Sequence, residues 1–131
     1  METVSPGARS FELPYPPSVN HYWRRVGHAT LISREGRRFR KAVCSALAAR
    51  LGRDPPLAGR LAVHVTVCPP DRRRRDLDNV QKALLDALEH GGVYRDDAQI
   101  DLLVVERGPV TPGGKSLVRV EVITQTPRAA E

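Results

Sequence analysis

The chain has 131 residues and a formal net charge of +6. This length predicts a single domain with its own hydrophobic core. No apolar run approaches the roughly 18 residues that a membrane span needs, and the first ten residues lack the apolar stretch of a secretory signal. The two cysteines show no metal-binding spacing. We therefore expect a cytoplasmic protein without a structural zinc site and without a membrane partner.

The positive charge is concentrated in the first part of the chain. Residues 1–53 carry a net charge of +7, whereas residues 54–131 carry −1. A concentrated basic region favours a polyanionic partner, because bound arginine and lysine side chains release counterions from phosphates. A purely compositional origin is the alternative, since 18 of the 21 basic residues are arginine. The uneven distribution favours nucleic-acid binding over a merely basic surface.

The first half of the chain predicts a short strand and a long helix. The strand is expected at residues 10–13, between a flexible end at residues 1–9 and an extended proline-rich stretch. The helix is expected to begin after Ser33, a good N-cap, and to run to Leu51, with Gly52 as its stop. Its apolar positions form one stripe at helical spacing: Phe39, Val43, Leu47 and Leu51.

The second half predicts a strand, a helix and two further strands. Apolar and polar residues alternate over residues 61–68, as in a strand. A second helix is expected from Asp76 or Leu77 to the stop at Gly91. Strands are expected at residues 99–107 and 116–124, and the proline- and glycine-rich residues between them predict a hairpin.

The order of these elements predicts the fold class. Strand, helix, strand, helix, strand, strand is typical of a small α+β domain with one mixed β-sheet and two main helices. We expect this single domain to occupy residues 1–131, with a second flexible end at residues 126–131.

Acidic residues gather in one part of the sequence. Eight of the fifteen lie between Asp71 and Asp101. Asp76 and Asp78 lie where a turn enters the second helix, and Asp97 follows that helix just before a strand. If these groups met at a sheet edge, their oxygens would suit a hard cation such as Mg²⁺. Each aspartate alone also has a structural interpretation, as a helix cap, a partner of the helix dipole or a turn residue.

Basic residues accompany this acidic segment. Lys82 lies one turn after Asp78 on the same helix face, where it could neutralise a phosphate or form a surface ion pair with Asp78. Asp86, farther along the helix, is predicted to be dispensable for the chemistry. The aspartates are immediately preceded by four consecutive arginines, Arg72, Arg73, Arg74 and Arg75. This arrangement favours a site at which a metal ion and a phosphate backbone meet.

The segment of residues 70–79 resembles the central motif of the RusA family of Holliday junction resolvases. Its most specific part is the run Arg-Asp-Leu-Asp-Asn that ends at Asn79, and the similarity continues through Lys82. Residues 96–99 resemble the family's second acidic motif, and residues 13–20 resemble its N-terminal signature. The resemblance covers about residues 10–124, nearly the whole chain.

This resemblance implies a small homodimeric endonuclease that uses Mg²⁺, with Mn²⁺ as a substitute. Such an enzyme resolves four-way DNA junctions by paired symmetric nicks, in recombination and repair. Residue by residue, the chain matches the family's catalytic, metal-binding aspartates at Asp76, Asp78 and Asp97, its catalytic lysine at Lys82, and a neighbouring acid at Asp96. We expect Lys82 and the four arginines to bind DNA.

The expected mechanism is metal-assisted phosphodiester hydrolysis with one or two ions. A dimer with twofold symmetry would match the approximate twofold symmetry of a four-way junction. Two other functions remain open at this point. One is a non-catalytic nucleic-acid-binding module, and the other is a metal-dependent nuclease that acts on flaps, forks or RNA.

Overall fold

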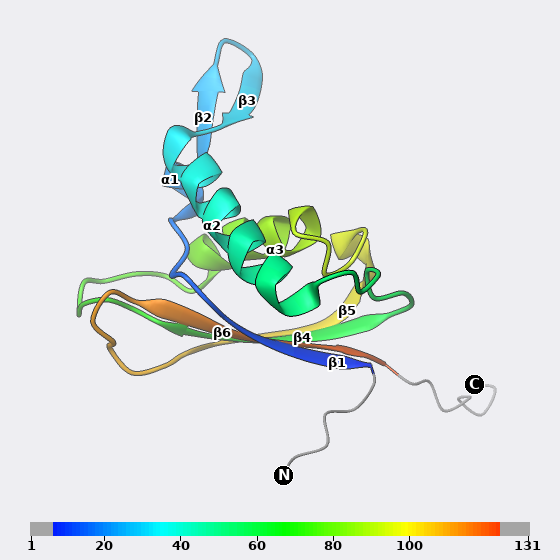
Figure 1. Cartoon of the computed structure of the whole chain (residues 1–131). Coiled ribbons are helices and arrows are strands. Elements are labelled where there is room, and N and C mark those ends of the chain that lie inside the picture. The colour runs from blue at the N-terminus through cyan, green and yellow to red at the C-terminus, as the bar shows by residue number, and fades with distance from the viewer. Residues whose placement is uncertain (1–6, 124–131) are drawn as a thin grey trace, which may run out of the picture.

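The structure, a computed structural model, describes residues 7–123. A mixed sheet lies against a layer of helices, which confirms the predicted α+β fold (Figure 1). No helix in the described range is long and apolar enough to cross a membrane. In chain order the elements are β1 (Ala8–Leu13), α1 (Val19–Tyr22), β2 (Trp23–Val26), β3 (Ala29–Ile32), α2 (Arg34–Leu51), β4 (Leu61–Cys68), α3 (Asp78–His90), the 3-10 helix η1 (Asp97–Gln99), β5 (Ile100–Arg107) and β6 (Lys115–Val122).

The main sheet has four strands in the order β1-β6-β4-β5. β4 pairs with β5 in parallel, while β6 is antiparallel to both β4 and β1. The parallel pair requires a crossover, and α3 supplies it. The predicted hairpin between the last two strands is therefore wrong, because β4 lies between β5 and β6.

The chain between β5 and β6 passes around the end of β4. The Gly108 N–H donates to the carbonyl of Val67 at 2.8 Å, and the Thr111 N–H donates to that of Pro69 at 2.8 Å. A Cβ at Gly108 would lie 2.7 Å from the sulfur of Cys68, so this close approach needs glycine. The proline and glycine residues correctly predict that the chain reverses between β5 and β6. They do not indicate that another strand, β4, lies between these two in the sheet.

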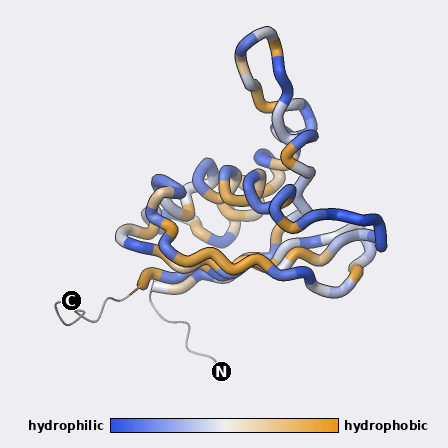
Figure 2. Tube along the Cα trace, turned by 180° about the vertical axis from the view of Figure 1, so that it is seen from behind, coloured by the Kyte–Doolittle hydropathy of each residue, from blue (hydrophilic) through white to orange (hydrophobic). Residues whose placement is uncertain are grey.

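The core lies between the sheet and the helices α2 and α3. In α2 the whole predicted stripe is buried, and Ser33 caps the helix by accepting from the Gly36 N–H at 2.9 Å. Burial of each such side chain stabilises the fold by about 1.5–3 kcal/mol. Figure 2 shows the apolar residues along the sheet and the facing helices. α3 contributes Val80, Ala83, Leu84, Ala87 and Leu88.

The chain ends differ partly from the prediction. Residues 8 and 9, expected in a flexible end, belong to β1, where Ala8 pairs with Glu121 of β6. Pairing with β6 extends β1 to residues 8 and 9, where the alternation of apolar and polar residues is no longer regular. The predicted end at residues 126–131 lies outside the described residues.

A second, two-stranded sheet was not predicted. β2 and β3 form a hairpin that stands away from the rest of the molecule (Figure 1). Its turn consists of Gly27 and His28, and Gly27 has a φ of 61°, a value that glycine adopts without strain. The glycine between two four-residue strands is a hairpin signal, but the arginines at positions 24 and 25 obscure the strand pattern.

Candidate active site

The arginine run and Asp76 lie in the connection from β4 to α3. Asp76 does not cap α3 through its side chain. The N-cap position is Leu77, and no side-chain hydrogen bond closes it. Only the backbone carbonyl of Asp76 takes part, accepting from the Asn79 N–H at 3.1 Å. The Asp76 carboxylate is exposed, so it is available to a ligand at this end of the sheet.

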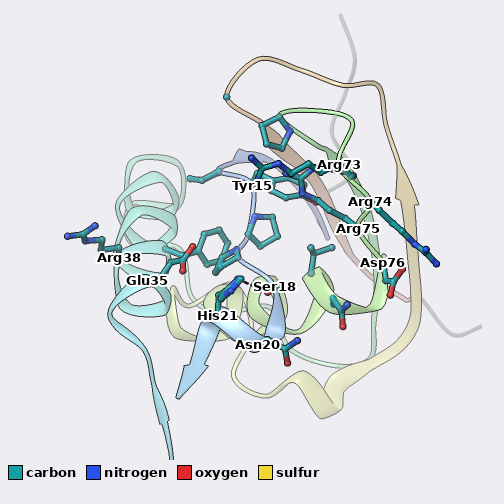
Figure 3. Close-up of a pocket in the computed structure, with 18 residues that line it drawn as sticks. Tyr15, Ser18, Asn20, His21, Glu35, Arg38, Arg73, Arg74, Arg75 and Asp76 are labelled. Atoms are coloured by element: carbon teal, nitrogen blue, oxygen red, sulfur yellow. Dashed lines mark hydrogen bonds between the residues drawn. The ribbon is translucent and has the colours of Figure 1, made fainter. Parts of the chain in front are cut away.

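A groove of about 970 Å³ opens beside Asp76. We call it the basic groove, because its lining includes Arg38, Arg73, Arg74 and Arg75. Its other walls come from the proline-rich stretch after β1, from α1 and from the first turns of α2 and α3. Figure 3 shows Arg74 extending toward the side of the groove on which Asp76 lies. The local charge is positive, because these four arginines outnumber the two carboxylates of the lining, Glu35 and Asp76.

The four arginines differ in their exposure and in their contacts. Arg75 is 23% exposed; its guanidinium lies 2.7 Å from the Asp71 carboxylate and 5.7 Å from the centre of the Tyr15 ring. The Arg75 guanidinium, followed by the N–H of Arg73, lowers the pKa of Asp71 to about 2. By contrast, Arg72, Arg73 and Arg74 are exposed. Arg75 therefore shapes the groove, whereas its three neighbours extend into solvent, where they can meet a polyanion. Of these, the Arg73 guanidinium also lies 4.0 Å from the Asp71 carboxylate.

Asp78 and Lys82 lie in the first turns of α3, and both are exposed. None of the ion pairs formed within residues 7–123 includes Lys82, so the structure shows no surface pair of Lys82 with Asp78. The free ammonium group lies on the same helix as Asp78, one turn farther on. This position keeps it available for a phosphate group close to the Asp78 carboxylate.

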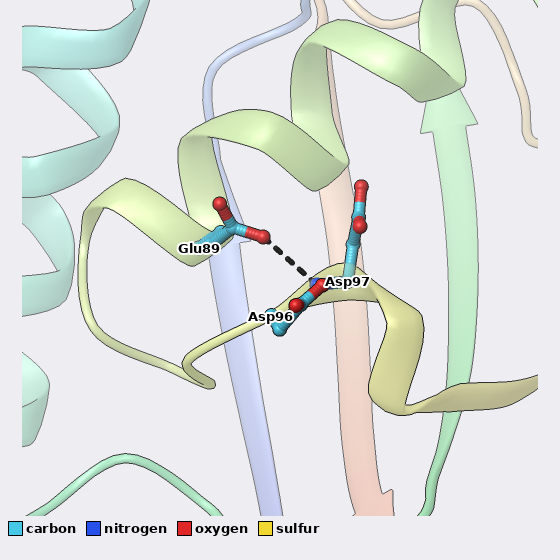
Figure 4. A group of neighbouring side chains, drawn as sticks. All are labelled: Glu89, Asp96 and Asp97. Atoms are coloured by element: carbon cyan, nitrogen blue, oxygen red, sulfur yellow. Dashed lines mark hydrogen bonds between the residues drawn. The ribbon is translucent and has the colours of Figure 1, made fainter.

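Asp97 lies in a different group of carboxylates, which we call the acidic cluster: Glu89, Asp96 and Asp97. One ligand oxygen from each lies within 4.8 Å of the others, and within the described residues no other group of three or more acidic, histidine or cysteine side chains does so. Glu89 accepts from the Asp97 N–H at 2.8 Å (Figure 4). Asp96 accepts from the Ala98 N–H at 2.8 Å. These bonds position the carboxylates of Glu89 and Asp96, each through one of its two oxygens.

The sequence pattern did not predict Glu89 as a member of this cluster. The available signal was the helix stop at Gly91-Gly92, which lets the chain turn back and bring Asp97 beside the last turn of α3.

The buried side chain of Tyr94 lies near the acidic cluster. Burial raises the pKa of Tyr94, and the charges of Asp97, Glu89 and Asp86 raise it further. The Tyr94 hydroxyl donates to the carbonyl of Leu85 at 2.6 Å.

The structure does not bring the three predicted metal ligands together in one chain. Asp78 is the first residue of α3, and Asp97 is bonded to Glu89 near its end. At 1.5 Å per residue, Asp78 and Glu89 are about 16 Å apart along the helix axis. The sheet imposes the same separation, because β4 and β5 are parallel: Asp76 follows the carboxyl end of β4 and Asp97 precedes the amino end of β5. The expected meeting at a sheet edge is therefore wrong for the single chain.

Comparison with known proteins gives the family. The family model described as endodeoxyribonuclease RusA matches residues 14–128. A protein of Enterobacteria phage HK97 named crossover junction endodeoxyribonuclease is 46% identical over 110 residues, which cover 84% of this chain and 91% of that protein. The protein of the same name from Escherichia coli K12 is 42% identical, over 81% of this chain and 88% of its own length. The chain belongs to the RusA family of endodeoxyribonucleases.

Proposed function

We propose that the chain is a Mg²⁺-dependent endonuclease that resolves four-way DNA junctions by paired symmetric nicks. It would act in the cytoplasm, in recombination and repair. The main structural support is the exposed carboxylate of Asp76 at the margin of the basic groove. The names of the relatives at 42–46% identity support the substrate class.

The proposed ligands are Asp76, Asp78 and Asp97. Their donor atoms fit a hard cation, because Mg²⁺ prefers carboxylate oxygens and water, with substrate phosphates completing its shell. When bound, the ion would polarise the scissile phosphate and supply a more acidic water. Lys82 would donate to a phosphate oxygen and balance its charge. Arg72, Arg73 and Arg74 would hold the DNA backbone and reduce its repulsion from the carboxylates.

We propose further that dimerisation completes the metal site. β5 is an edge strand of the sheet, so one side of its backbone has no strand partner. Its outer face exposes Leu102 at 54% and Val104 at 38%. Unprotected edge strands normally carry lysine, proline or a covering segment, yet residues 102–105 are Leu-Leu-Val-Val. These features favour pairing with a second copy.

Antiparallel pairing of two β5 strands has a direct consequence for the site. It places the amino end of one β5 beside the carboxyl end of the other. Asp97 of the partner subunit would then lie at the end of the sheet that holds Asp76 and Asp78. A twofold axis perpendicular to the sheet keeps both helical layers on one side, and it generates two identical sites, as paired nicking requires.

The function is tested by a cleavage assay on a synthetic four-way junction, a linear duplex and a flap. The expected result is symmetric nicking of the junction with Mg²⁺ or Mn²⁺ and none with excess EDTA. Preference for the flap would favour a nuclease for other branched substrates. Junction binding without cleavage in any metal would favour a non-catalytic binding module, and either result would contradict the proposal.

The shared site is tested by co-expressing Asp76→Asn and Asp97→Asn chains. Each variant alone should be inactive. In a mixed dimer, one shared site carries both changes and the other carries none, so single-strand nicking should reappear. If each chain builds its own site, every site in the mixture is defective and no nicking returns. Full activity of wild-type protein beside an inactive mixture would reject the shared site while leaving the endonuclease proposal intact.

A further inference from the structure

The β2–β3 hairpin has an exposed apolar tip on a firmly held base. Every residue from Arg24 to Leu31 is exposed, including the large apolar side chains of Val26 at 44% and Leu31 at 47%. Figure 1 shows the hairpin projecting beyond the helical layer. A two-stranded hairpin alone is marginally stable in water, so its persistence depends on the base.

The base is fixed by several contacts. Tyr22 is completely buried, and its carbonyl accepts from the Ser33 N–H at 2.8 Å. The hydroxyl of Ser33 donates to the same carbonyl at 2.9 Å. The Trp23 ring packs edge-on against Tyr22, with 4.9 Å between centroids. A Cβ at Gly36 would collide with the Tyr22 carbonyl, so the first turn of α2 sits directly against the base.

The strand register sorts the tip residues into two faces. Arg24 pairs with Leu31, and Val26 pairs with Ala29, so these four side chains share one face. That face combines three apolar residues with one arginine. Arg25 and Thr30 form the other face. The tip is therefore apolar on one side and bears a cation on each side.

The charge around the hairpin indicates a polyanionic partner. No acidic residue occurs between Glu12 and Glu35, a segment that carries Arg24, Arg25 and Arg34. The hairpin also rises from the margin of the basic groove, which includes His21 and Arg38. A polyanion in the groove would pass the hairpin base, so the surroundings favour a polyanion over a neutral protein surface as the partner of the hairpin.

We propose that the hairpin is a wedge that inserts Val26 and Leu31 at the branch point of a DNA junction. This inference rests on the proposed function. Apolar side chains that enter between base pairs must break stacking, at a cost of a few kcal/mol per step in continuous duplex. At a branch point the stacking is already interrupted, so the same insertion costs less. The wedge would thus favour junctions over linear DNA, while Arg24 and Arg25 contact phosphates.

The test compares Val26→Thr/Leu31→Thr with wild type. Threonine keeps a high strand propensity, so the hairpin should persist, as far-UV circular dichroism and thermal unfolding can check. The matched control is Val110→Thr/Leu117→Thr, which changes two equally exposed apolar residues outside the hairpin, at 46% and 40%. The DNA is a four-way junction with 2-aminopurine beside the branch point, and a linear duplex of the same sequence, both without divalent metal.

Wild type and control should raise the 2-aminopurine fluorescence on binding the junction, because insertion unstacks the probe. The hairpin variant should lose most of this rise, and its preference for junction over duplex should fall by about tenfold, with duplex affinity retained. An Arg24→Gln/Arg25→Gln variant should instead weaken both substrates alike. A hairpin variant indistinguishable from wild type in fluorescence and preference would overturn the wedge. Failure of wild type to bind or cleave junctions would instead refute the proposed function.

Discussion

The guanidinium of Arg40 in α2 lies 2.7 Å from the carboxylate of Asp86 in α3. The same carboxylate accepts from the hydroxyl of buried Tyr22, at the end of α1. Arg40 also donates to the Tyr22 hydroxyl at 3.3 Å. Burial, followed by the bond to Asp86, raises the pKa of Tyr22 to about 12. This cluster joins three helices at the base of the projecting hairpin.

Asp86→Ala should therefore destabilise the fold. The change leaves the Arg40 charge and the Tyr22 hydroxyl without their acceptor, and both ion-pair partners are less than 30% exposed (23% and 28%). We expect a loss of about 2 kcal/mol in the free energy of unfolding, measured by urea denaturation. Asp54→Ala, at an exposed position, is the control and should change stability by less than about 0.5 kcal/mol. Equal stability of the two variants would show that the cluster contributes nothing to the fold.

The pair of Asp71 and Arg75 should be visible in the pH titration of the carboxyl group. The folded-state pKa of Asp71 is lowered from 3.8 to about 2, so its contribution to stability is present above pH 3.8 and is lost as the pH falls through 2. Carboxyl ¹³C NMR should show Asp71 still ionised at pH 3. In Arg75→Gln the midpoint should return toward 3.8, and an unchanged midpoint would exclude the ion pair as its cause.

Replacement of the proposed metal ligands should separate catalysis from binding. Asp76→Asn, Asp78→Asn and Asp97→Asn should each reduce junction cleavage by more than about 100-fold, because asparagine lacks the charge that holds a hard cation. Junction affinity should stay constant or rise slightly, since a negative charge near DNA is removed. Thermal unfolding should be nearly unchanged for Asp76→Asn, because its side chain caps nothing. Asp54→Asn is the control, and variants that cleave as well as this control would contradict the assignment.

The exposed arginines should set the salt dependence of binding. Each of Arg72→Gln, Arg73→Gln and Arg74→Gln should weaken junction and duplex binding together. Each should also reduce the slope of log affinity against log salt by up to about 0.9 per lost phosphate contact. Filter binding at several salt concentrations measures both quantities. If all three variants had the wild-type slope, these arginines would not contact the DNA phosphates.

The edge strand should control assembly. Leu102→Lys/Val104→Lys places like charges against each other in the proposed antiparallel pair, where they repel. Because both side chains are exposed, at 54% and 38%, the single chain should still fold. Sedimentation should show a monomer, and cleavage should be lost with it. Val110→Lys/Leu117→Lys is the control and should remain dimeric; a dimeric β5 variant would reject this interface.

Several elements could be placed from local patterns alone. α2 was predicted with its N-cap, stripe and stop because cap chemistry and helical periodicity are local properties, carried by Ser33, Phe39 and Leu51. β4 was predicted because one face of it is buried, which imposes strict alternation over residues 61–68. The acidic and basic residues of the central motif were recognisable because they are adjacent in the chain.

Strand order and the spatial grouping of carboxylates could not be obtained in this way. β5 and β6 are joined by turn residues, yet the long-range pairing of β4 with both of them determines where they lie. For the same reason Asp97 lies beside Glu89, at the far end of α3 from Asp78. A helix of 13 residues acts as a rigid spacer, and the parallel arrangement of β4 and β5 places the two aspartate groups at opposite ends of it.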